Sequence, residues 1–466
     1  MNGPAHVNNQ QQSGYDLDVL GQQPSLKIYT QICLCFPVAD ASSHSAIIKT
    51  LTNGLERLSA SFPWLAGKVV NEGSCEGNTG VFKIKPFEKI PRLVIKDLRH
   101  DPSAPTMDSL RQADFPFSML DENVIAPRKT LPGPDESALE TPVFLLQANF
   151  IAGGLLLTFV GEHNVMDMTG QGQIIHLFSK ACRKEQYTSE ELSSGNLPRH
   201  NLVPFLDDSY KQGPELADQI VRPAPSPSHP IPDGHTAPPP LPRCTWAYFT
   251  FPPTSHAALK SLAAKSISPT AGYASTDDAL SAFIWQSVAR ARLSRLDPTV
   301  KIAFGRAVDV RRYLDIPDTY PGLMQNMVYH TDTLQKLVEK PLGHVASQLR
   351  STLDPQKLRY HTRALATFLD RIPDKTIISF AAMFDLSVDI MISSWAKVNC
   401  YELDFNLGLG KPEAVRRPRF DPVESLIYFM PRALDGEIAV AVCLRDEDIE
   451  YLRADEEFAR YGRYIG

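Results

Sequence analysis

The sequence predicts an α/β protein whose chain is divided into two domains of mixed sheet and helices. Three observations support this prediction. Strand-like, helix-like and hairpin-like segments follow one another in a similar order in each half of the chain. A proline-rich stretch near the middle separates the two halves. The length of 466 residues exceeds that of one ordinary domain and suits two or three.

The sequence predicts that the chain is divided into four segments. Residues 1–23 are mostly polar, and we expect them to be disordered. Residues 24–204 form the predicted N-terminal domain, and residues 244–466 form the C-terminal one. Residues 205–243 form a crossover, which carries nine prolines from position 223 to position 242. Because proline has no N–H to donate, such a density predicts a stiff, extended connection without regular structure.

In the first half, residues 28–36 are rich in strand formers. Apolar residues at helical spacing predict a helix that begins after Ser43 and ends near residues 62–63. Residues 143–160 predict a buried β-hairpin, since two apolar runs flank the turn Ala152-Gly153-Gly154. Residues 169–182 predict a second helix with one apolar face.

The second half begins with a predicted strand at residues 245–251. The run Ser275-Thr276-Asp277-Asp278 is typical of a helix N-cap, and the helix is expected to continue to about residue 293. Residues 300–310 predict another strand, and residues 425–444 predict a hairpin around Asp435-Gly436. A charged helix is expected at residues 446–460.

Composition excludes several classes of protein. The formal net charge of −6 is not the basic balance that nucleic-acid binders show. No apolar run is long enough for a membrane span, and the N-terminus lacks a signal-peptide pattern. Seven cysteines without a C-x-x-C pair favour a reducing, cytoplasmic setting over disulfides or a structural zinc. We therefore expect no membrane, no nucleic acid and no metal.

A histidine followed four residues later by an aspartate is the candidate catalytic motif. This spacing occurs at His163 with Asp167 and again at His229 with Asp233, so spacing alone does not discriminate. His229 lies in the crossover, where nothing rigid positions a side chain. His163 follows a predicted buried strand and precedes a helix, a common place for active-site groups. The alternative for His163 is a partly buried histidine satisfied by hydrogen bonds.

Five stretches, in order, resemble the BAHD acyltransferase family, with the closest likeness to its fungal branch, the trichothecene O-acetyltransferases. Ser393-Ser394-Trp395 precedes Asp404-Phe405-Asn406-Leu407-Gly408, which resembles the DFGWG motif with asparagine and leucine in place of glycine and tryptophan. Asparagine is the residue next best to glycine in left-handed backbone, so the turn is expected to survive. The five stretches are residues 147–154, 163–167, 275–285, 307–326 and 393–408.

The resemblance implies two chloramphenicol-acetyltransferase-like domains with a tunnel between them and a histidine near its middle. It implies a monomeric acyltransferase of groups other than aminoacyl groups, without a permanently bound cofactor. Acyl-CoA, with acetyl-CoA favoured, would enter from one face as co-substrate. A small-molecule alcohol would enter from the other face, and a trichothecene is the acceptor that the resemblance implies.

The resemblance also implies roles for particular residues. His163 would be the general base, which takes the proton of the acceptor hydroxyl. Trp395, with Ser393 nearby, would stabilise the oxyanion, because an indole N–H can only donate. Asp167 would turn away from the histidine and pair with Arg311. Asp404 and Gly408 would be structural, near the CoA entrance.

Four residues are expected at the CoA channel. Ser275 and Thr276 would line it, and Lys411 or Arg416 would meet a phosphate. Solvated surface charge is the alternative for either of these two cations.

Two other functions remain open from the sequence. A nonribosomal-peptide condensation domain shares the expected fold but uses an HHxxxDG motif, where this chain has Glu162 and Met168 at the first and last positions. A catalytically silent relative that binds without turnover is the second alternative. A requirement for a carrier-bound acyl group would indicate the first, and absence of CoA release would indicate the second.

Overall fold

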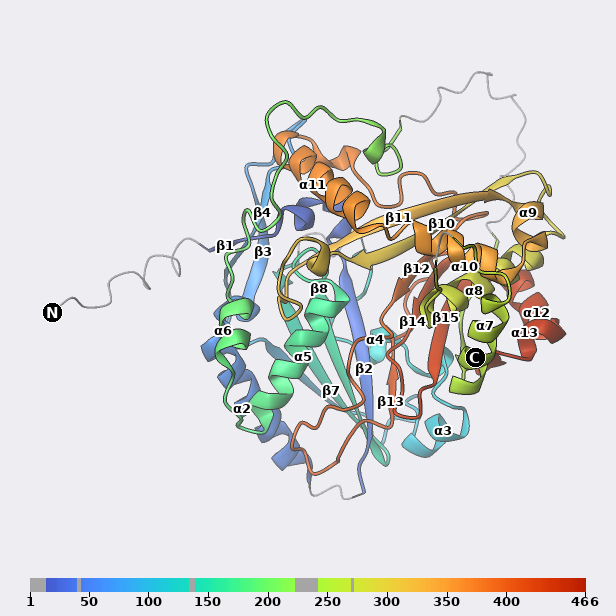
Figure 1. Cartoon of the computed structure of the whole chain (residues 1–466). Helices are drawn as coiled ribbons and strands as arrows, with labels where there is room; N and C mark the ends of the chain where they lie inside the picture. The colour runs from blue at the N-terminus through green and yellow to red at the C-terminus, as the bar shows by residue number, and fades with distance from the viewer. Residues whose placement is uncertain (1–13, 40–42, 134–138, 223–241, 270–271) are drawn as a thin grey trace, which may run out of the picture.

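The structure is a computed structural model that describes residues 14–39, 43–133, 139–222, 242–269 and 272–466. Its described strands form three sheets, of five, four and seven strands. The five-stranded and seven-stranded sheets lie side by side, each with helices on its outer side (Figure 1). This agrees with the predicted α/β class.

The candidate histidine, His163, follows the central strand of the five-stranded sheet and precedes helix α5 (Met168–Cys182). Three strands, β2 (Tyr29–Pro37), β7 (Phe144–Ile151) and β8 (Gly154–Glu162), are buried along almost their whole length. Apolar side chains of α2 (His44–Ser61) and α5 cover one face of the sheet, and those of the short helices α3 (Met107–Gln112) and α4 (Glu122–Ile125) pack on the other. The predicted strand, hairpin and two helices of the first half are all present. The sheet has the order β13 (Ala414–Arg416), β2 (Tyr29–Pro37), β8 (Gly154–Glu162), β7 (Phe144–Ile151) and β5 (Arg92–Asp97), and the helices are α2 (His44–Ser61) and α5 (Met168–Cys182).

A four-stranded sheet lies beside it and includes the start of the described chain. Strand β1 and the 3-10 helix Val19–Gln22 are ordered, and Leu17, Asp18 and Leu20 are buried. The expected disorder is therefore wrong for residues 14–23, because Asp18 accepts hydrogen bonds from Arg199 and Tyr320; residues 1–13 lie outside the described residues. The order is β1 (Tyr15–Asp16), β4 (Val81–Pro86), β3 (Gly67–Glu72) and β6 (Thr141–Pro142), and the short helices of this half are α3 (Met107–Gln112), α4 (Glu122–Ile125) and α6 (Ser189–Gly195).

The seven-stranded sheet is built entirely from the second half of the chain. The predicted strands at 245–251 and 300–310 and the hairpin at 425–444 are present. Its order is β11 (Gln325–Thr333), β10 (Lys301–Asp309), β12 (Ile390–Ser394), β14 (Leu426–Phe429), β15 (Ile438–Arg445), β9 (Cys244–Phe251) and β16 (Arg463–Tyr464).

Helices of the second half other than α11 (Pro355–Arg371) pack on this sheet, whereas α11 packs against the 3-10 helix Val19–Gln22 and the segment after β10. The predicted cap of α8 is confirmed, since Ser275 and Asp278 form a reciprocal capping box. The helix expected at 446–460 is two helices, because Asp455 interrupts it and caps the second. The helices are α7 (Pro253–Ala264), α8 (Thr276–Arg292), α9 (Leu334–Glu339), α10 (Leu342–Ser351), α11 (Pro355–Arg371), α12 (Asp446–Ala454) and α13 (Glu456–Ala459).

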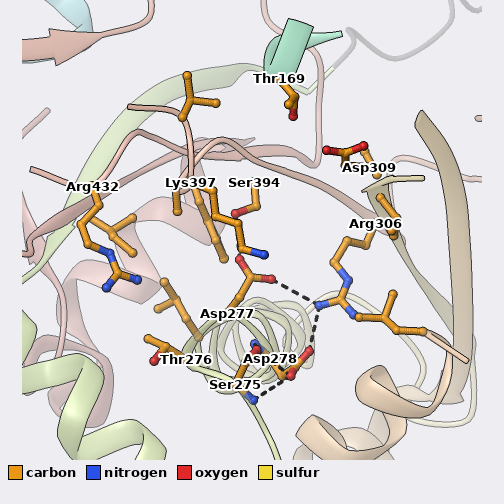
Figure 2. A pocket seen from close by; sticks show the side chains of 18 of the residues that line it. Thr169, Ser275, Thr276, Asp277, Asp278, Arg306, Asp309, Ser394, Lys397 and Arg432 are labelled. Atoms are coloured by element: carbon orange, nitrogen blue, oxygen red, sulfur yellow. Dashed lines mark hydrogen bonds and ion pairs between the residues drawn. The ribbon is translucent and has the colours of Figure 1, made fainter. Parts of the chain in front are cut away.

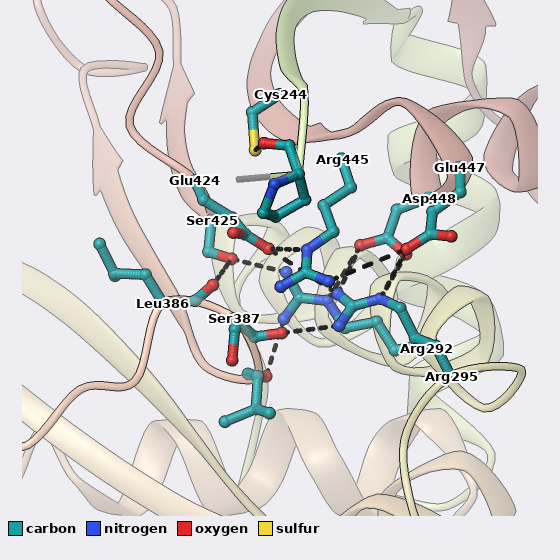
Figure 3. Close-up of polar contacts among 12 residues, drawn as sticks. Cys244, Arg292, Arg295, Leu386, Ser387, Glu424, Ser425, Arg445, Glu447 and Asp448 are labelled. Atoms are coloured by element: carbon teal, nitrogen blue, oxygen red, sulfur yellow. Dashed lines mark hydrogen bonds and ion pairs between the residues drawn. The ribbon is translucent and has the colours of Figure 1, made fainter. Parts of the chain in front are cut away.

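A buried ionic network holds the C-terminal end of α8 (Figure 3). Arg292 is 1% exposed and donates to Asp448 at 3.2 Å and to Ser425 at 2.5 Å. Arg295 reaches the same carboxylate at 2.9 Å. Because Arg292 at the end of α8 and Arg295 just after it share one buried acid, the end of α8 is tied to α12 and, through Ser425, to the start of β14. This fixes the helix whose opposite end faces the candidate site.

One strand of the second half joins the sheet of the first half. β13 belongs to the second half by sequence but pairs antiparallel with β2 in the sheet of the first half. One apolar cluster contains Leu34 and Phe159 of the first half together with Trp395 and Val415 of the second. The domain boundaries themselves stay a prediction, and the centre of the crossover, residues 223–241, lies outside the described residues.

None of the helices in the described part of the chain is long and apolar enough to cross a membrane.

Candidate active site

His163 lies between the end of β8 and the start of α5, as predicted. Its main-chain N–H donates to the carbonyl oxygen of Ile28 at 2.7 Å, which fixes the backbone. Its ring Nδ1 lies 3.2 Å from the carbonyl oxygen of Met166. A carbonyl oxygen only accepts, so this contact places the proton of the neutral ring on Nδ1. The lone pair is then on Nε2, which forms no hydrogen bond within the described residues.

The surroundings of His163 favour its neutral form. Burial is the main cause that lowers the pKa of His163 below its ordinary value. The Met166 carbonyl and the charge of Asp167 act in the opposite direction, and the charge of Arg417 adds to the lowering. A neutral imidazole with a free Nε2 is the form that a general base requires.

Asp167 faces away from the imidazole and into the second half of the chain. Its carboxylate caps α5 by accepting from the Gly170 N–H at 2.8 Å. Both of its oxygens also meet the Arg311 guanidinium at 3.0 Å, and Oδ2 accepts from the Met324 N–H at 2.7 Å. The ion pair expected between Asp167 and Arg311 is therefore present.

Arg311 is fully buried, and its guanidinium N–H groups donate to several acceptors besides Asp167. The guanidinium also donates to the carbonyl oxygens of Tyr320 at 2.9 Å and Gly322 at 2.7 Å, and to Asp309 at 2.9 Å. The neighbouring carboxylates raise the pKa of Arg311 despite its burial. Arg311 thus fixes the segment after β10 against the turn that contains Asp167.

Glycines near the motif allow close packing between the halves. A Cβ atom at Gly170 would lie 2.3 Å from the Pro321 carbonyl oxygen, and one at Gly172 would lie 2.5 Å from the Val398 side chain. Real Cβ atoms do not approach so closely, so the second half contacts helix α5 only because these positions lack side chains.

Trp395 and Ser393 form a pair at the end of β12. The indole N–H of Trp395 donates to Ser393 Oγ at 3.1 Å, and the tryptophan is 2% exposed. The indole donor is therefore engaged by a neighbour and does not point freely at a ligand. Because the serine oxygen accepts this bond, its own O–H remains able to donate elsewhere.

A cavity of about 990 Å³ lies beside the motif and is lined by both halves (Figure 2). Thr169, Gly172 and His176 come from α5, and Ser275 and Thr276 come from the N-terminal end of α8. His163 itself does not line this cavity; the helix that follows it does. The cavity is large enough for an extended small molecule.

Charged side chains line the cavity unevenly. Arg306 is paired with Asp277 at 3.3 Å and with Asp278 at 3.0 Å, and the two carboxylates lie on α8 (Figure 2). Lys260, Lys397 and Arg432 line the same cavity, are exposed, and form no ion pair with any residue that the structure describes. These three cations are available to an anionic ligand.

The predicted CoA residues divide into two groups. Ser275 and Thr276 line the cavity beside the motif, and their contact with CoA stays a prediction. Lys411 lies outside the cavity lining and pairs with Glu402. The assignment of Arg416 to a phosphate is wrong: the residue is 6% exposed on β13, and its guanidinium donates to the carbonyl oxygens of Phe115, Val415 and Asp114.

Asp404 and Gly408 lie in a loop that contacts the end of α5. Asp404 accepts from the Asn406 N–H at 2.7 Å, and its carbonyl oxygen accepts from Arg183 at 2.5 Å. Asn406 and Gly408 have φ of 54° and 75°, so the left-handed turn expected of the altered motif is confirmed. Neither Asp404 nor Gly408 lines the cavity.

Sequence reasoning missed several residues that the structure brings to the site. Lys260, Lys397 and Arg432 are distant in sequence and carry no motif, although Lys397 follows Trp395 by two positions. Arg417 was missed because it looks the same as its neighbour Arg416 in sequence. Only packing distinguishes these cations from solvated surface charge.

Comparisons with known proteins agree with this geometry. Residues 122–459 match the family model described as the Transferase family, and residues 28–182 match the trichothecene 3-O-acetyltransferase-like N-terminal domain. The chain is 61% identical over 453 residues to an O-acetyltransferase of a Cryptosporiopsis species, with 97% of each chain covered. It is 54% identical over 454 residues to the trichothecene 3-O-acetyltransferase of Fusarium sporotrichioides, also with 97% of each covered.

A solved structure is similar along the whole chain. The crystal structure of F. graminearum TRI101 complexed with coenzyme A and deoxynivalenol superposes with a TM-score of 0.92 at 49% identity, covering 97% of this chain and 100% of that one. Family model, relatives and fold agree: the chain belongs to the Transferase family, with an N-terminal domain of the trichothecene 3-O-acetyltransferase-like type.

Proposed function

We propose that this protein is an acyl-CoA-dependent O-acetyltransferase that transfers the acetyl group of acetyl-CoA to a hydroxyl of a secondary metabolite. The observation that carries the proposal is the state of His163. Its Nδ1 is held by the Met166 carbonyl, its Nε2 is free within the described residues, and burial keeps the ring neutral. Membership of the Transferase family and relatives that are named O-acetyltransferases support the same reaction.

The proposed reaction uses the neutral ring of His163 as a base close to the thioester of acetyl-CoA. Nε2 of His163 takes the proton of the acceptor hydroxyl while the hydroxyl oxygen forms a bond to the thioester carbonyl carbon. The tetrahedral intermediate then collapses, the C–S bond breaks, and the imidazolium returns the proton to the CoA sulfur. General base catalysis of this kind contributes about 10²–10⁴-fold. The products are an acetyl ester and free CoA, and the histidine is neutral again.

Ser393 is the proposed direct donor to the oxyanion, and Trp395 is its support. The indole N–H is engaged by Ser393 Oγ, which leaves the serine O–H to be directed at a substrate oxygen. A preorganised donor of this kind stabilises charge that develops in the transition state. Asp167 and Arg311 shape the turn that carries His163 and take no proton.

The cavity between α5 and α8 is the proposed CoA site. Ser275 and Thr276 lie at the N-terminal end of α8, where the helix dipole favours negative charge. Lys260, Lys397 and Arg432 are the proposed contacts of the CoA phosphates, since they line the cavity without an ion pair to any described residue. Arg312 lines it without an ion pair too, but its guanidinium donates to the Tyr313 hydroxyl and lies over the Tyr313 ring. Asp404 and Gly408 are proposed to shape the neighbouring loop without contacting CoA.

A trichothecene is the proposed acceptor. The related TRI101 proteins have been crystallised with coenzyme A and deoxynivalenol or T-2 mycotoxin. The described cysteines are free, and most are buried, which supports action in the reducing cytosol. The enzyme is proposed to act as a monomer.

The test is a direct assay with purified protein, acetyl-CoA and deoxynivalenol. Free CoA and an acetylated trichothecene, identified by mass spectrometry, are expected to appear in equal amounts without any carrier protein. A reaction that required an acyl group bound to a carrier would favour the condensation-type enzyme. CoA release no faster than in the no-protein control, with deoxynivalenol and with other alcohols, would favour the silent binding protein.

A further inference from the structure

Arg417 is a buried arginine whose charge has no partner. It is 1% exposed and follows β13 directly. Its Nη2 has one long hydrogen bond, to Thr130 Oγ1 at 3.4 Å, while Nε and Nη1 have none. No carboxylate forms an ion pair with it in the described chain. A buried charge normally requires a partner, because its removal from water is costly.

Three aromatic rings surround the guanidinium instead of an acid. Its central carbon lies 4.4 Å from the ring centre of Phe420, 4.6 Å from that of Tyr428 and 5.3 Å from that of Trp395. Such rings hold a cation by their negative faces without neutralising it. The positive charge of Arg417 is therefore fixed in place and still acts on its surroundings.

A short series of contacts links Arg417 to the proposed base. Thr130, its hydrogen-bond partner, accepts through its carbonyl oxygen from the Tyr29 N–H at 3.0 Å. The residue before Tyr29, Ile28, accepts from the His163 N–H at 2.7 Å. Arg417 also contacts Trp395, whose N–H donates to Ser393. The cation is thus linked to the backbone that holds His163 and to the proposed oxyanion donor, and its charge acts on His163.

The other charged groups near His163 differ in how they are compensated. Asp167 is engaged by Arg311 at 3.0 Å. Burial raises the pKa of Glu162 well above its usual value, which favours its neutral form, while the charge of Lys27 acts in the opposite direction. Glu122 accepts from the Thr130 N–H at 2.8 Å; burial raises its pKa, and the charge of Arg417 lowers it. Among these groups Arg417 is the fully buried cation that has no ion-pair partner in the described chain.

We propose that Arg417 is an electrostatic positioning residue of the acyl transfer. Its fixed positive charge adds to the effect of burial in favouring the neutral, proton-accepting form of His163, and it stabilises the oxyanion that forms when the acceptor attacks the thioester. Arg417 acts through the electric field of its guanidinium and through Trp395, which holds Ser393. It does not contact the substrate. This inference rests on the proposed acetyltransferase function.

The experiment compares three substitutions at one position with a matched control. Arg417→Met removes the charge but keeps an apolar chain against the rings, and Arg417→Lys keeps the charge. Arg417→Gln is the reserve if the methionine variant does not fold. Arg419→Met is the control, because Arg419 lies in the same segment and is exposed in an ion pair with Asp121. Deoxynivalenol and acetyl-CoA are the substrates, and melting temperature is measured for each variant.

We expect Arg417→Met to lower kcat at least about tenfold, with KM for acetyl-CoA within about threefold; loss of one direct oxyanion donor costs about 10²–10³. The acid limb of kcat/KM should move to higher pH, since a cation that lowered the pKa of His163 is gone. Arg417→Lys should keep the limb near its wild-type position, and Arg419→Met should change kcat less than twofold. Histidine NMR should report a raised pKa of His163 in Arg417→Met.

The possible results distinguish a failure of the Arg417 role from a failure of the proposed acetyltransferase function. An active wild type with unchanged kcat and pH profile in Arg417→Met overturns the role of Arg417 alone. A loss of activity that follows the melting temperature, with an unmoved acid limb, also overturns it and shows a structural clamp. A wild type that acetylates no alcohol overturns the acetyltransferase proposal, and this inference with it.

Discussion

Asp167 and Arg311 form a buried, bidentate ion pair between the two halves of the chain. Each carboxylate oxygen lies 3.0 Å from a guanidinium nitrogen, and the arginine is fully buried. The aspartate of the HxxxD motif therefore joins the halves and does not act on the histidine ring. It also caps α5, so one side chain sets both the turn and the contact.

Asp167→Asn is expected to lower the free energy of unfolding by about 3–5 kcal/mol, because it removes the buried one of the two carboxylates that pair with the buried Arg311. Urea unfolding measures this. Asp309→Asn is the matched control, since Asp309 meets the same guanidinium but its side chain is 42% exposed. We expect less than about 1 kcal/mol there. Equal losses in the two variants would contradict the structural role assigned to Asp167.

His163→Ala is expected to lower acetyl transfer by about 10²-fold or more, because the only proposed proton acceptor is gone. Its melting temperature and circular dichroism should stay near those of the wild type. His200→Ala, at an exposed position, is the control and should leave turnover unchanged. Retention of more than about a tenth of wild-type turnover in His163→Ala would exclude the base assignment, given the roughly 10²-fold effect expected.

The pH dependence of kcat/KM is expected to follow the ionisation of His163. Burial lowers its pKa from the ordinary value of 6.5, so the active neutral form persists below that pH. Activity should rise with pH through an apparent pKa below 6.5 and then level off. The same shift makes stability fall as the pH drops below 6.5, because the unfolded chain binds the proton more readily. An acid limb centred above pH 7 would argue against this assignment.

Lys397→Ala and Arg432→Ala are each expected to raise KM for acetyl-CoA by about tenfold while kcat changes little, since a lost charge-assisted contact costs about 1.5 kcal/mol or more. Added salt should weaken acetyl-CoA binding to the wild type more than to either variant. Lys411→Ala is the control, because Lys411 lies outside the cavity and pairs with Glu402. A larger effect at Lys411 than at Lys397 would place the CoA phosphates elsewhere.

Ser393→Ala is expected to lower kcat by about 10²-fold with little change in KM, as found for loss of one oxyanion donor. Ser394→Ala is its neighbouring control, because the Ser394 hydroxyl is bound to Asp277 at 2.7 Å. Trp395→Phe should cost less than Ser393→Ala, since it removes only the bond that orients the serine. A larger loss of kcat in Trp395→Phe than in Ser393→Ala would show that the indole N–H is the oxyanion donor.

Much of the fold was predictable because its signals are local. The hairpin before His163, the capped helix at Ser275 and the turn at Asn406 each depend on neighbouring residues, whose spacing and backbone preferences are legible in the sequence. The N-terminal segment was misjudged for the complementary reason. Its polar composition is local, whereas the burial of Asp18 depends on Arg199 and Tyr320, far away along the chain.

Local patterns along the chain were sufficient to predict the α/β class, the position of His163 at a strand end and the motifs that mark the family. Which charges face the site depends on folding and could not be predicted. Arg416 and Arg417 are adjacent and identical in type, yet Arg416 is held by carbonyl oxygens and Arg417 lies without an ion pair among aromatic rings. The physical reason is that burial and charge compensation come from residues brought together by folding, and sequence spacing does not record such contacts.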